Sequence, residues 1–368
     1  MAKVRKTTRR QFLSGAAAVE AVGDLTHGIA VEARAGKFKQ PPTSQPRETY
    51  LVQFARTAMA CEFQIFLTAD HPPFAPQAAI SALDLVDHLE EQMTVYREDS
   101  ELSAINRQAV AGAVEVESRL FELVQRCAWL YDETAGAFDI TAGPLSKVWG
   151  FFRREGKLPG EDDIQSALDL VGTEKLTLDA NGETVRFARD GVEMNLGGIG
   201  KGYALDRAAA LLQSEDVENF LFHGGRSSVL ARGSRVPSDA ENNPWTVGIG
   251  HPRRPDRRLG LLVLHDKAMS TSGTATQSFH HAGKRYGHIL DPRTGRPAEG
   301  VLSVTALCDD AALADALSTS FYVLGVEKTE EFCQRHPEAS ALVVLPTKSA
   351  QQVEVVSINM PEGAWEAL

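Results

Sequence analysis

Residues 194–212, MNLGGIGKGYALDRAAALL, constrain the fold of this chain more than any other stretch. Lys201 lies there among four glycines, Gly197, Gly198, Gly200 and Gly202. Because glycine lacks Cβ, such a loop can adopt positive φ and can bring its backbone close to a ligand. Residues 203–212 are good helix formers, so the sequence predicts a glycine loop that runs into a helix.

This arrangement favours the binding of an anion. The first N–H groups of a helix are free and lie at the positive end of its dipole, and Lys201 adds a charge suited to a phosphate oxygen. The stretch is not a P-loop, because Gly202 follows the lysine where Ser or Thr is needed, and it does not complete a G-x-G-x-x-G fingerprint. A tight strand-to-helix turn with an exposed lysine is the alternative to a phosphate site.

The 368 residues carry a formal net charge of -11, and 43% of them are hydrophobic. This length fits one elaborated domain or two closely packed ones, with ample material for a large core. The acidic balance argues against general binding to nucleic acid or to anionic membranes. No segment after the N-terminal region offers an uncharged apolar run long enough to span a bilayer. The cysteines form no C-x-x-C pair, so we expect most of them to be buried free thiols.

The N-terminus resembles a twin-arginine export signal. Arg9 and Arg10 precede Phe-Leu and a weakly apolar run, and Ala33-Arg34-Ala35 is similar to a cleavage site. The alternative is a basic, disordered N-terminus. We expect residues 1–35 to direct export to the periplasm or the cell-envelope side, residues 36–49 to form a linker, and residues 50–368 to form the folded domain.

Hydrophobic periodicity predicts helices over 76–93, 117–135, 203–212 and 311–324, and Ser100 as the N-cap of a short helix that ends near Asn106. Strand patterns occur over 63–67, 219–222, 245–249, 259–264, 285–290, 302–308 and 339–345. Residues 176–196 predict a hairpin around Asn181-Gly182 that delivers the chain into the glycine loop. Strands joined by hairpins and interrupted by helices favour the α+β class.

Several motifs occur in a fixed order. NLGGIGKGYALDRA is followed by TSG, RYGHILDPRTGRP and ADALSTS, and the N-terminal half contains DSELSAIN and FDITAGPLSKVWGF. Each motif alone is weak, but together in this order they are specific. Over residues 55–345 the chain resembles the ApbE family of FAD:protein FMN transferases. The resemblance implies an ApbE-like α+β fold with mainly antiparallel sheets flanked by helices.

The resemblance also implies a reaction. FAD is split at its pyrophosphate, FMN is transferred to a threonine hydroxyl of a target flavoprotein, and AMP is released. A divalent metal, taken here as Mg²⁺, would be held by Asp315, Thr319 and the backbone carbonyl of Gly200. Asp315 and Thr319 share one face of the predicted helix, and Mg²⁺ prefers oxygen ligands. Without the surrounding motifs, Asp315 would be interpreted as a helix-surface carboxylate.

Three further matches concern the phosphates and the flavin. His288 corresponds to a family histidine that we expect to move the acceptor proton or to bind phosphate. Lys201 is expected to steady phosphate or developing charge, and Asp206 matches an acid that contacts flavin or ribose. The plainer alternatives are a strand-edge histidine bonded to a carbonyl and a helix-surface acid. We therefore predict Lys201, His288 and Asp315 as the catalytic residues.

The remaining predicted contacts surround the FAD. For the isoalloxazine region we predict Met59, Tyr96, Ser103, Asn106 and Thr141. Tyr96 and Met59 could equally be core residues, and Ser103 and Asn106 could be helix caps. The predicted FAD contacts also include Gly198, Lys201, Asp206, Thr271 and His288.

Three positions depart from the common family pattern. Met59-Ala60-Cys61 stands where Met-Gly-Thr is common, Gly225-Arg226-Ser227 replaces a Gly-Gly-Asp type turn, and Thr274-Ala275-Thr276 follows the TSG motif where an aromatic residue is frequent. Two other functions use the same pocket: storage of FAD without transfer, and an FAD pyrophosphatase in which water replaces the threonine hydroxyl. The Asp315 and Thr319 pair favours chemistry over storage, because storage needs no metal at the pyrophosphate.

Overall fold

The computed structural model of the chain describes residues 50–236, 243–273, 277–349 and 351–368. The expected export signal and linker lie outside the described residues, and so does Thr274-Ala275-Thr276. Among the described helices, none is both long enough and apolar enough to cross a bilayer.

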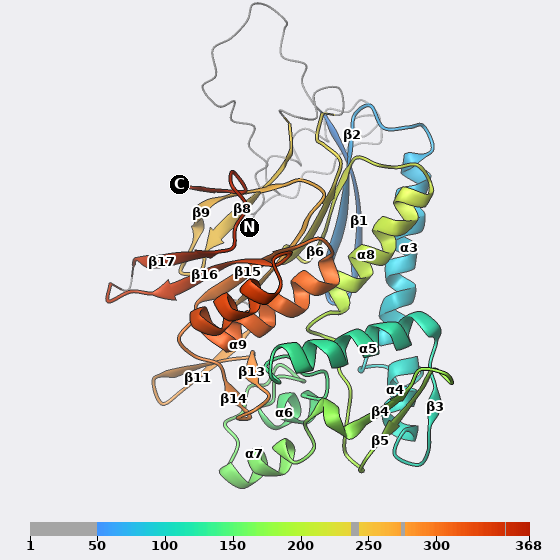
Figure 1. Cartoon of the computed structure of the whole chain (residues 1–368), viewed down its shortest axis with the longest axis vertical. Coiled ribbons are helices and arrows are strands. Elements are labelled where there is room, and N and C mark those ends of the chain that lie inside the picture. The colour runs from blue at the N-terminus through green and yellow to red at the C-terminus, as the bar shows by residue number, and fades with distance from the viewer. Residues whose placement is uncertain (1–49, 237–242, 274–276, 350) are drawn as a thin grey trace, which may run out of the picture.

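An antiparallel sheet of eight strands organises the fold (Figure 1), in the order β1-β2-β6-β7-β10-β15-β16-β17. Its strands are β1 (Leu51–Ala58), β2 (Cys61–Thr68), β6 (Phe220–Gly224), β7 (Ser228–Arg232), β10 (Ala268–Gly273), β15 (Ser303–Cys308), β16 (Ser340–Pro346) and β17 (Val353–Ile358).

Both faces of this sheet carry apolar side chains, and successive residues of a strand alternate between the two faces. In β2, Phe63 and Ile65 pack in the larger core, whereas Phe66 packs against the smaller core on the other face. The larger core is covered by α3 (Ala75–Met93), α8 (Gly200–Ser214) and α9 (Ala311–Arg335). The smaller core is covered by a three-stranded sheet of β8 (Trp245–His251), β9 (Arg254–Leu264) and β18 (Trp365–Ala367).

A second group of elements lies below the sheet and α9 in Figure 1. Its helices are α4 (Glu101–Gln108), α5 (Ser118–Glu133), α6 (Gly143–Val148), α7 (Glu161–Leu168) and the 3₁₀ turn η1 (Thr173–Lys175). Its strands are β3 (Val114–Glu115), β4 (Leu176–Asp179), β5 (Thr184–Phe187), β11 (Ser278–His281), β12 (Lys284–Gly287), β13 (Leu290–Asp291) and β14 (Arg296–Pro297).

The predicted α+β class with mainly antiparallel sheets is confirmed. The Ser100 side chain accepts a hydrogen bond from the Ser103 N–H and caps α4, as predicted. The strand expected to run to residue 196 is wrong, because β5 ends at Phe187 and residues 188–199 form no strand. Cys127, Cys308 and Cys333 are buried free thiols, and Cys61 is half-buried.

Candidate active site

The end of the glycine segment packs two helices together. None of its four glycines is among the described residues with positive φ, so the segment does not use that conformational freedom. Gly200, Lys201 and Gly202 instead form the first turn of α8. A Cβ on Gly202 would lie 2.0 Å from the carbonyl oxygen of Ala311. Only glycine therefore lets the start of α8 approach the start of α9 this closely.

The two helices also cap each other. The Gly202 N–H donates to Oδ2 of Asp315 on α9 at 3.1 Å. In return, the Asp206 carboxylate on α8 accepts the N–H groups of Ala311 and Ala312, each at 2.8 Å. One N–H group at the start of α8 and two at the start of α9 are thus satisfied by a carboxylate from the other helix.

Asp206 consequently lies in the α8–α9 contact, and its interpretation as a helix-surface acid is wrong. Burial, followed by the nearby charge of Asp310, raises the pKa of Asp206 to about 7. Both carboxylate oxygens are used by the N-terminus of α9. This geometry gives Asp206 a structural role in positioning α9, and the predicted flavin or ribose contact remains a prediction.

Asp315 is the centre of a buried polar group that we call the Asp315 cluster: Lys201, Ser228, Ser270 and Asp315. The Lys201 Nζ lies 3.3 Å from each carboxylate oxygen. The hydroxyls of Ser228 and Ser270 donate to Oδ1 at 3.1 and 2.9 Å. Asp315 is 4% exposed, so it is not the helix-surface carboxylate that its sequence alone would suggest.

The predicted metal ligands Asp315 and Thr319 lie one turn apart on α9, where the Thr319 hydroxyl donates to the Asp315 backbone carbonyl at 3.4 Å. Thr319 Oγ1 lies 3.0 Å from the hydroxyl of Ser272, and Gly200 belongs to the same helical turn as Gly202. Among the described residues, no group of three or more His, Cys, Asp or Glu side chains could hold a metal ion. Mg²⁺ is often bound by one or two carboxylates together with substrate phosphates and water. One carboxylate among hydroxyl and carbonyl oxygens therefore fits Mg²⁺ better than a transition metal.

His288 lies between β12 and β13, just outside the strand predicted for it. Its Nδ1 lies 3.0 Å from the carbonyl oxygen of Gln277. A carbonyl only accepts, so Nδ1 carries a hydrogen and a neutral ring presents its lone pair at Nε2. Burial is the largest influence and lowers the pKa of His288; the Gln277 hydrogen bond opposes this, and the charge of Lys201 adds to it. His288 is therefore a neutral base near the Asp315 cluster at pH 7.

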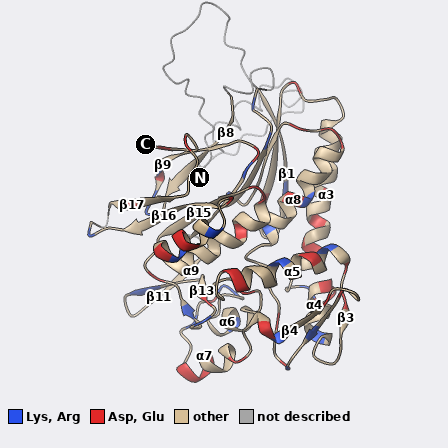
Figure 2. Ribbon diagram, in the orientation of Figure 1, with Lys and Arg blue, Asp and Glu red and all other residues tan. Residues whose placement is uncertain are grey.

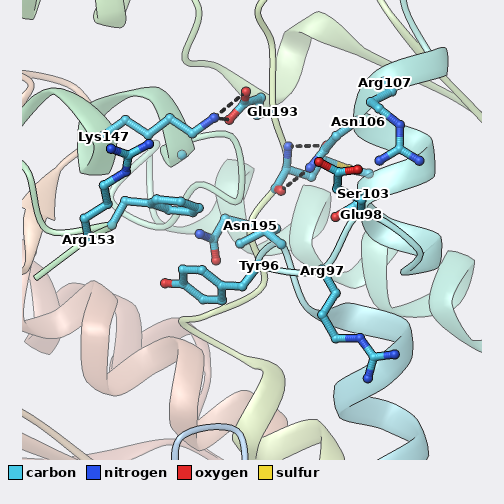
Figure 3. A pocket seen from close by; sticks show the side chains of 14 residues that line it. Tyr96, Arg97, Glu98, Ser103, Asn106, Arg107, Lys147, Arg153, Glu193 and Asn195 are labelled. Carbon is cyan, nitrogen blue, oxygen red and sulfur yellow. Dashed lines mark hydrogen bonds and ion pairs between the residues drawn. The ribbon is translucent and has the colours of Figure 1, made fainter.

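A cavity of about 470 Å³ is lined by residues of α4, of α6 and of the segment that precedes α8, and Figure 3 shows the side chains that line it. Tyr96, Ser103 and Asn106 line it, which is where the sequence predicted a flavin ring. Met194 and Asn195 also line it, and the chain continues from them to Lys201. The size and the mixed lining are those of a small-molecule site.

Two consecutive phenylalanines relate the cavity to His288: one lines the cavity and the other contacts the histidine. Phe152 lines the cavity and stacks on Tyr96, with ring centroids 4.7 Å apart. The ring of Phe151 faces that of His288 with centroids 6.5 Å apart. Because Phe151 and Phe152 are adjacent in the chain, the backbone links the ring contact of His288 to the stacked Tyr96–Phe152 pair.

Asn106 has a structural task within the lining. Its amide Nδ2 donates to the Met194 carbonyl at 2.9 Å, and its Oδ1 accepts the Met194 N–H at 2.8 Å. These two hydrogen bonds tie α4 to the segment that leads into α8. Ser103 donates to the Thr94 carbonyl at 3.3 Å, so both side chains shape the cavity wall as well as facing it.

Several predicted contacts lie away from the cavity lining. Thr141 is buried, and its hydroxyl joins Asp139 to the Gly172 N–H. The Thr271 hydroxyl pairs with that of Thr305, on the sheet face opposite to Ser270 and Ser272. A flavin role for either side chain has no support from this placement.

Met59 and Gly198 also lie outside the cavity lining. Met59 forms the β1–β2 turn with Ala60 and packs against the larger core. The φ angles of these two residues are 50° and 57°. A Cβ on Gly198 would lie 3.3 Å from the Phe138 ring, so this glycine relieves crowding behind the loop.

Sequence reasoning missed some residues that the structure brings to the site. Figure 3 shows Asn195 projecting into the cavity between the walls that carry Lys147 and Asn106. Lys147 donates to Glu193 at 2.6 Å on one of these walls. Strand alternation could have identified Ser270 and Ser272, because residues on either side of Thr271 must point to the opposite face of β10.

The sequence of the chain is similar to those of known proteins. A sequence model described as the ApbE family matches residues 59–343. The FAD:protein FMN transferase of Haemophilus influenzae is 31% identical over 261 residues, 69% of this chain and 74% of that protein. The FAD:protein FMN transferase of Vibrio cholerae is 33% identical over 250 residues, 66% of this chain and 72% of that protein.

Solved structures of ApbE proteins have a similar fold. The ApbE protein of Thermotoga maritima superposes with a TM-score of 0.74 at 30% identity, covering 83% of this chain and 97% of that one. The apo flavinyl transferase ApbE of Pseudomonas stutzeri has a TM-score of 0.73 at 26% identity, covering 86% of this chain and 96% of that one.

Proposed function

The chain belongs to the ApbE family and is a flavin transferase, and we propose that it moves FMN from FAD to a threonine hydroxyl of a target flavoprotein in a metal-dependent reaction that releases AMP. One observation carries the proposal. The buried Asp315 cluster lies within range of the neutral His288, and the Phe151 ring that faces His288 is next in the chain to Phe152, which lines a cavity large enough for a flavin ring. A substrate that joins a flavin to a pyrophosphate fits such a site.

His288 is the proposed general base. Nε2 accepts the proton of the threonine hydroxyl as the threonine oxygen attacks the phosphorus of the FMN half. A new P–O bond forms to threonine, the P–O bond to the AMP phosphate breaks, and its electron pair leaves with AMP. The neutral ring required for this step is the one favoured by burial and by the Lys201 charge.

Lys201 and Asp315 act on the phosphates. Lys201 brings a positive charge to the developing negative charge, where pre-placed charges are most effective. Asp315, Thr319 and the Gly200 carbonyl would hold Mg²⁺, which when bound neutralises phosphate charge and aligns the oxygens. Ser228 and Ser270 hold the Asp315 carboxylate in place by hydrogen bonds.

Intact-mass measurement tests the proposal. The protein is incubated with FAD, Mg²⁺ and candidate acceptor proteins, and AMP is measured in the same samples. We expect an acceptor to gain the mass of FMN, together with one AMP for each FMN transferred. AMP released with free FMN and no acceptor adduct would mark a pyrophosphatase, and bound FAD without AMP would mark a storage protein.

We also propose that the N-terminal segment directs export to the periplasm or the cell envelope. The support is the Arg9-Arg10 pair before an apolar run. The double change Arg9→Lys and Arg10→Lys keeps the charge but removes the guanidinium pair, so the protein should accumulate in the cytoplasm. Unchanged export of that variant would contradict the twin-arginine assignment.

A further inference from the structure

A short loop that follows Phe151 presents three exposed positive charges. Residues 153–157 read Arg-Arg-Glu-Gly-Lys, and their three basic side chains are exposed. No hydrogen bond or ion pair of these three side chains is recorded with any described residue, whereas Arg97, Lys147 and Arg296 elsewhere have acidic partners. We call Arg153, Arg154 and Lys157 the basic loop. Its free charges contrast with the net charge of -11 of the whole chain.

Backbone hydrogen bonds hold the basic loop in one shape. The N–H groups of Arg154 and Lys157 donate to the carbonyls of Phe151 and Trp149 at 3.1 and 2.9 Å. Gly156 packs so closely on the β11–β12 hairpin that a Cβ there would lie 2.7 Å from Phe279. Figure 2 shows further basic residues on that hairpin. The charges are therefore presented on a fixed support.

The position of the loop relates it to the chemistry. Phe151 precedes it and carries the ring that faces His288, and its carbonyl accepts a hydrogen bond from the Gln277 amide at 3.0 Å. Arg153 lines the cavity, but Arg154 and Lys157 lie outside the lining. Arg154 and Lys157 are exposed, so they are available to a molecule that docks on the surface rather than to one that fills the cavity.

We propose that the basic loop docks the acceptor protein by binding acidic residues on either side of its acceptor threonine. The proposal rests on the transferase function, because the acceptor must then bring a hydroxyl to His288. Complementary charges would guide the acceptor to the cavity mouth and fix its orientation. They would also offset the repulsion between an acidic acceptor segment and this acidic chain.

The test uses the FAD-loaded protein and fluorescently labelled synthetic peptides. One peptide has a central threonine flanked by aspartates, and the other has asparagines at the same positions. The test variant carries Arg154→Glu and Lys157→Glu, both outside the cavity lining. The control variant carries Arg257→Glu and Lys348→Glu, two exposed residues on β9 and after β16 that have no recorded partner among the described residues. Both variants change the net charge equally.

Fluorescence anisotropy at low ionic strength should show that the aspartate peptide binds the wild type at least about tenfold more tightly than the asparagine peptide. The Arg154→Glu, Lys157→Glu variant should lose that preference, whereas the control should keep it. FAD binding should be equal in all three proteins. Binding should weaken steeply with salt.

Three results would overturn the proposal. They are equal binding of the two peptides to the wild type, an undiminished preference in the test variant, and binding of phosphatidylglycerol vesicles without binding of the aspartate peptide. Because these measurements need no FMN transfer, they fail or succeed separately from the proposed reaction.

Discussion

The two ends of the proposed FAD site are built in different ways. At the phosphate end, Ser228, Ser270 and Asp315 are at most 4% exposed, and the Asp315 carboxylate accepts bonds from four groups. At the flavin end, Tyr96 is 69% exposed and is held mainly by its stacking on Phe152. The carboxylate where bonds would break is fixed by several contacts, whereas the exposed Tyr96 ring is fixed by few. We therefore expect substitutions that disrupt the packing at the phosphate end to destabilise the fold, and substitution of Tyr96 at the flavin end to affect binding alone.

Gly202→Ala should have the largest effect on stability. The new Cβ would meet the Ala311 carbonyl at the contact that joins α8 to α9, so we expect a loss of about 3 kcal/mol or more in the free energy of unfolding. Denaturant unfolding measures it. Gly112→Ala is the matched control, since a Cβ there meets nothing within 4 Å. Equal stability of both variants would remove the basis for calling the phosphate end rigid.

His288→Ala should slow FMN transfer by about 10²–10⁴-fold while FAD still binds. The pKa of His288 is lowered by burial, so the neutral base is lost only as the pH falls below 6.5 and the ring takes up a proton. The wild type should therefore lose activity on that acid side, and the variant should lack this dependence. Single-turnover AMP release across pH is the measurement. A variant that keeps the wild-type rate or the same acid limb would reduce His288 to a structural residue.

Tyr96→Ala should weaken FAD binding about fivefold, because an aromatic pair contributes about 1 kcal/mol beyond its buried area. Stability should change by no more than about 0.5 kcal/mol at so exposed a position. Flavin fluorescence and thermal unfolding measure the two effects. Phe74→Ala, another exposed aromatic at the start of α3, should leave FAD binding unchanged. A large loss of stability in Tyr96→Ala would break the contrast between the two ends.

Ala60→Gly should have the smallest effect and the opposite sign. Ala60 adopts φ 57° in the β1–β2 turn, at the position where glycine is common in the family. Relief of this left-handed conformation should stabilise the fold by about 0.5–1 kcal/mol. The control Ala210→Gly, at an exposed position of α8, should instead destabilise by about 1 kcal/mol. A loss of stability in Ala60→Gly would show that the turn carries no strain.

Much of the fold could be predicted because local patterns agree with tertiary packing. The helices over 76–93 and 117–135 and the Ser100 cap follow from apolar spacing and capping chemistry. The predicted helix end at residue 324 corresponds to the break in α9 at Gly325, where φ is 74°. The strand expected up to residue 196 does not form, because backbone N–H and C=O groups there bond to side chains, as Met194 does to Asn106.

The site was harder to predict than the fold. Motifs identified Lys201, His288 and Asp315, which the structure brings close together. They gave no indication that Asp206 caps α9 or that Gly202 is required by a helix contact, because both depend on residues about 105 positions away. Motif matching also chose Thr271 over Ser270 and Ser272, since it does not consider which face of a strand a side chain occupies.

The central claim is that FAD is cleaved at the Asp315 cluster, and Asp315→Asn tests it most directly. Asparagine keeps the shape of the side chain and an acceptor for the Gly202 N–H, so the variant should fold and bind FAD. Without the carboxylate charge it should not hold Mg²⁺. Single-turnover AMP release at saturating FAD and Mg²⁺, measured on a sample whose FAD binding has been verified, should therefore be lost. AMP release at the wild-type rate from that sample would contradict the claim.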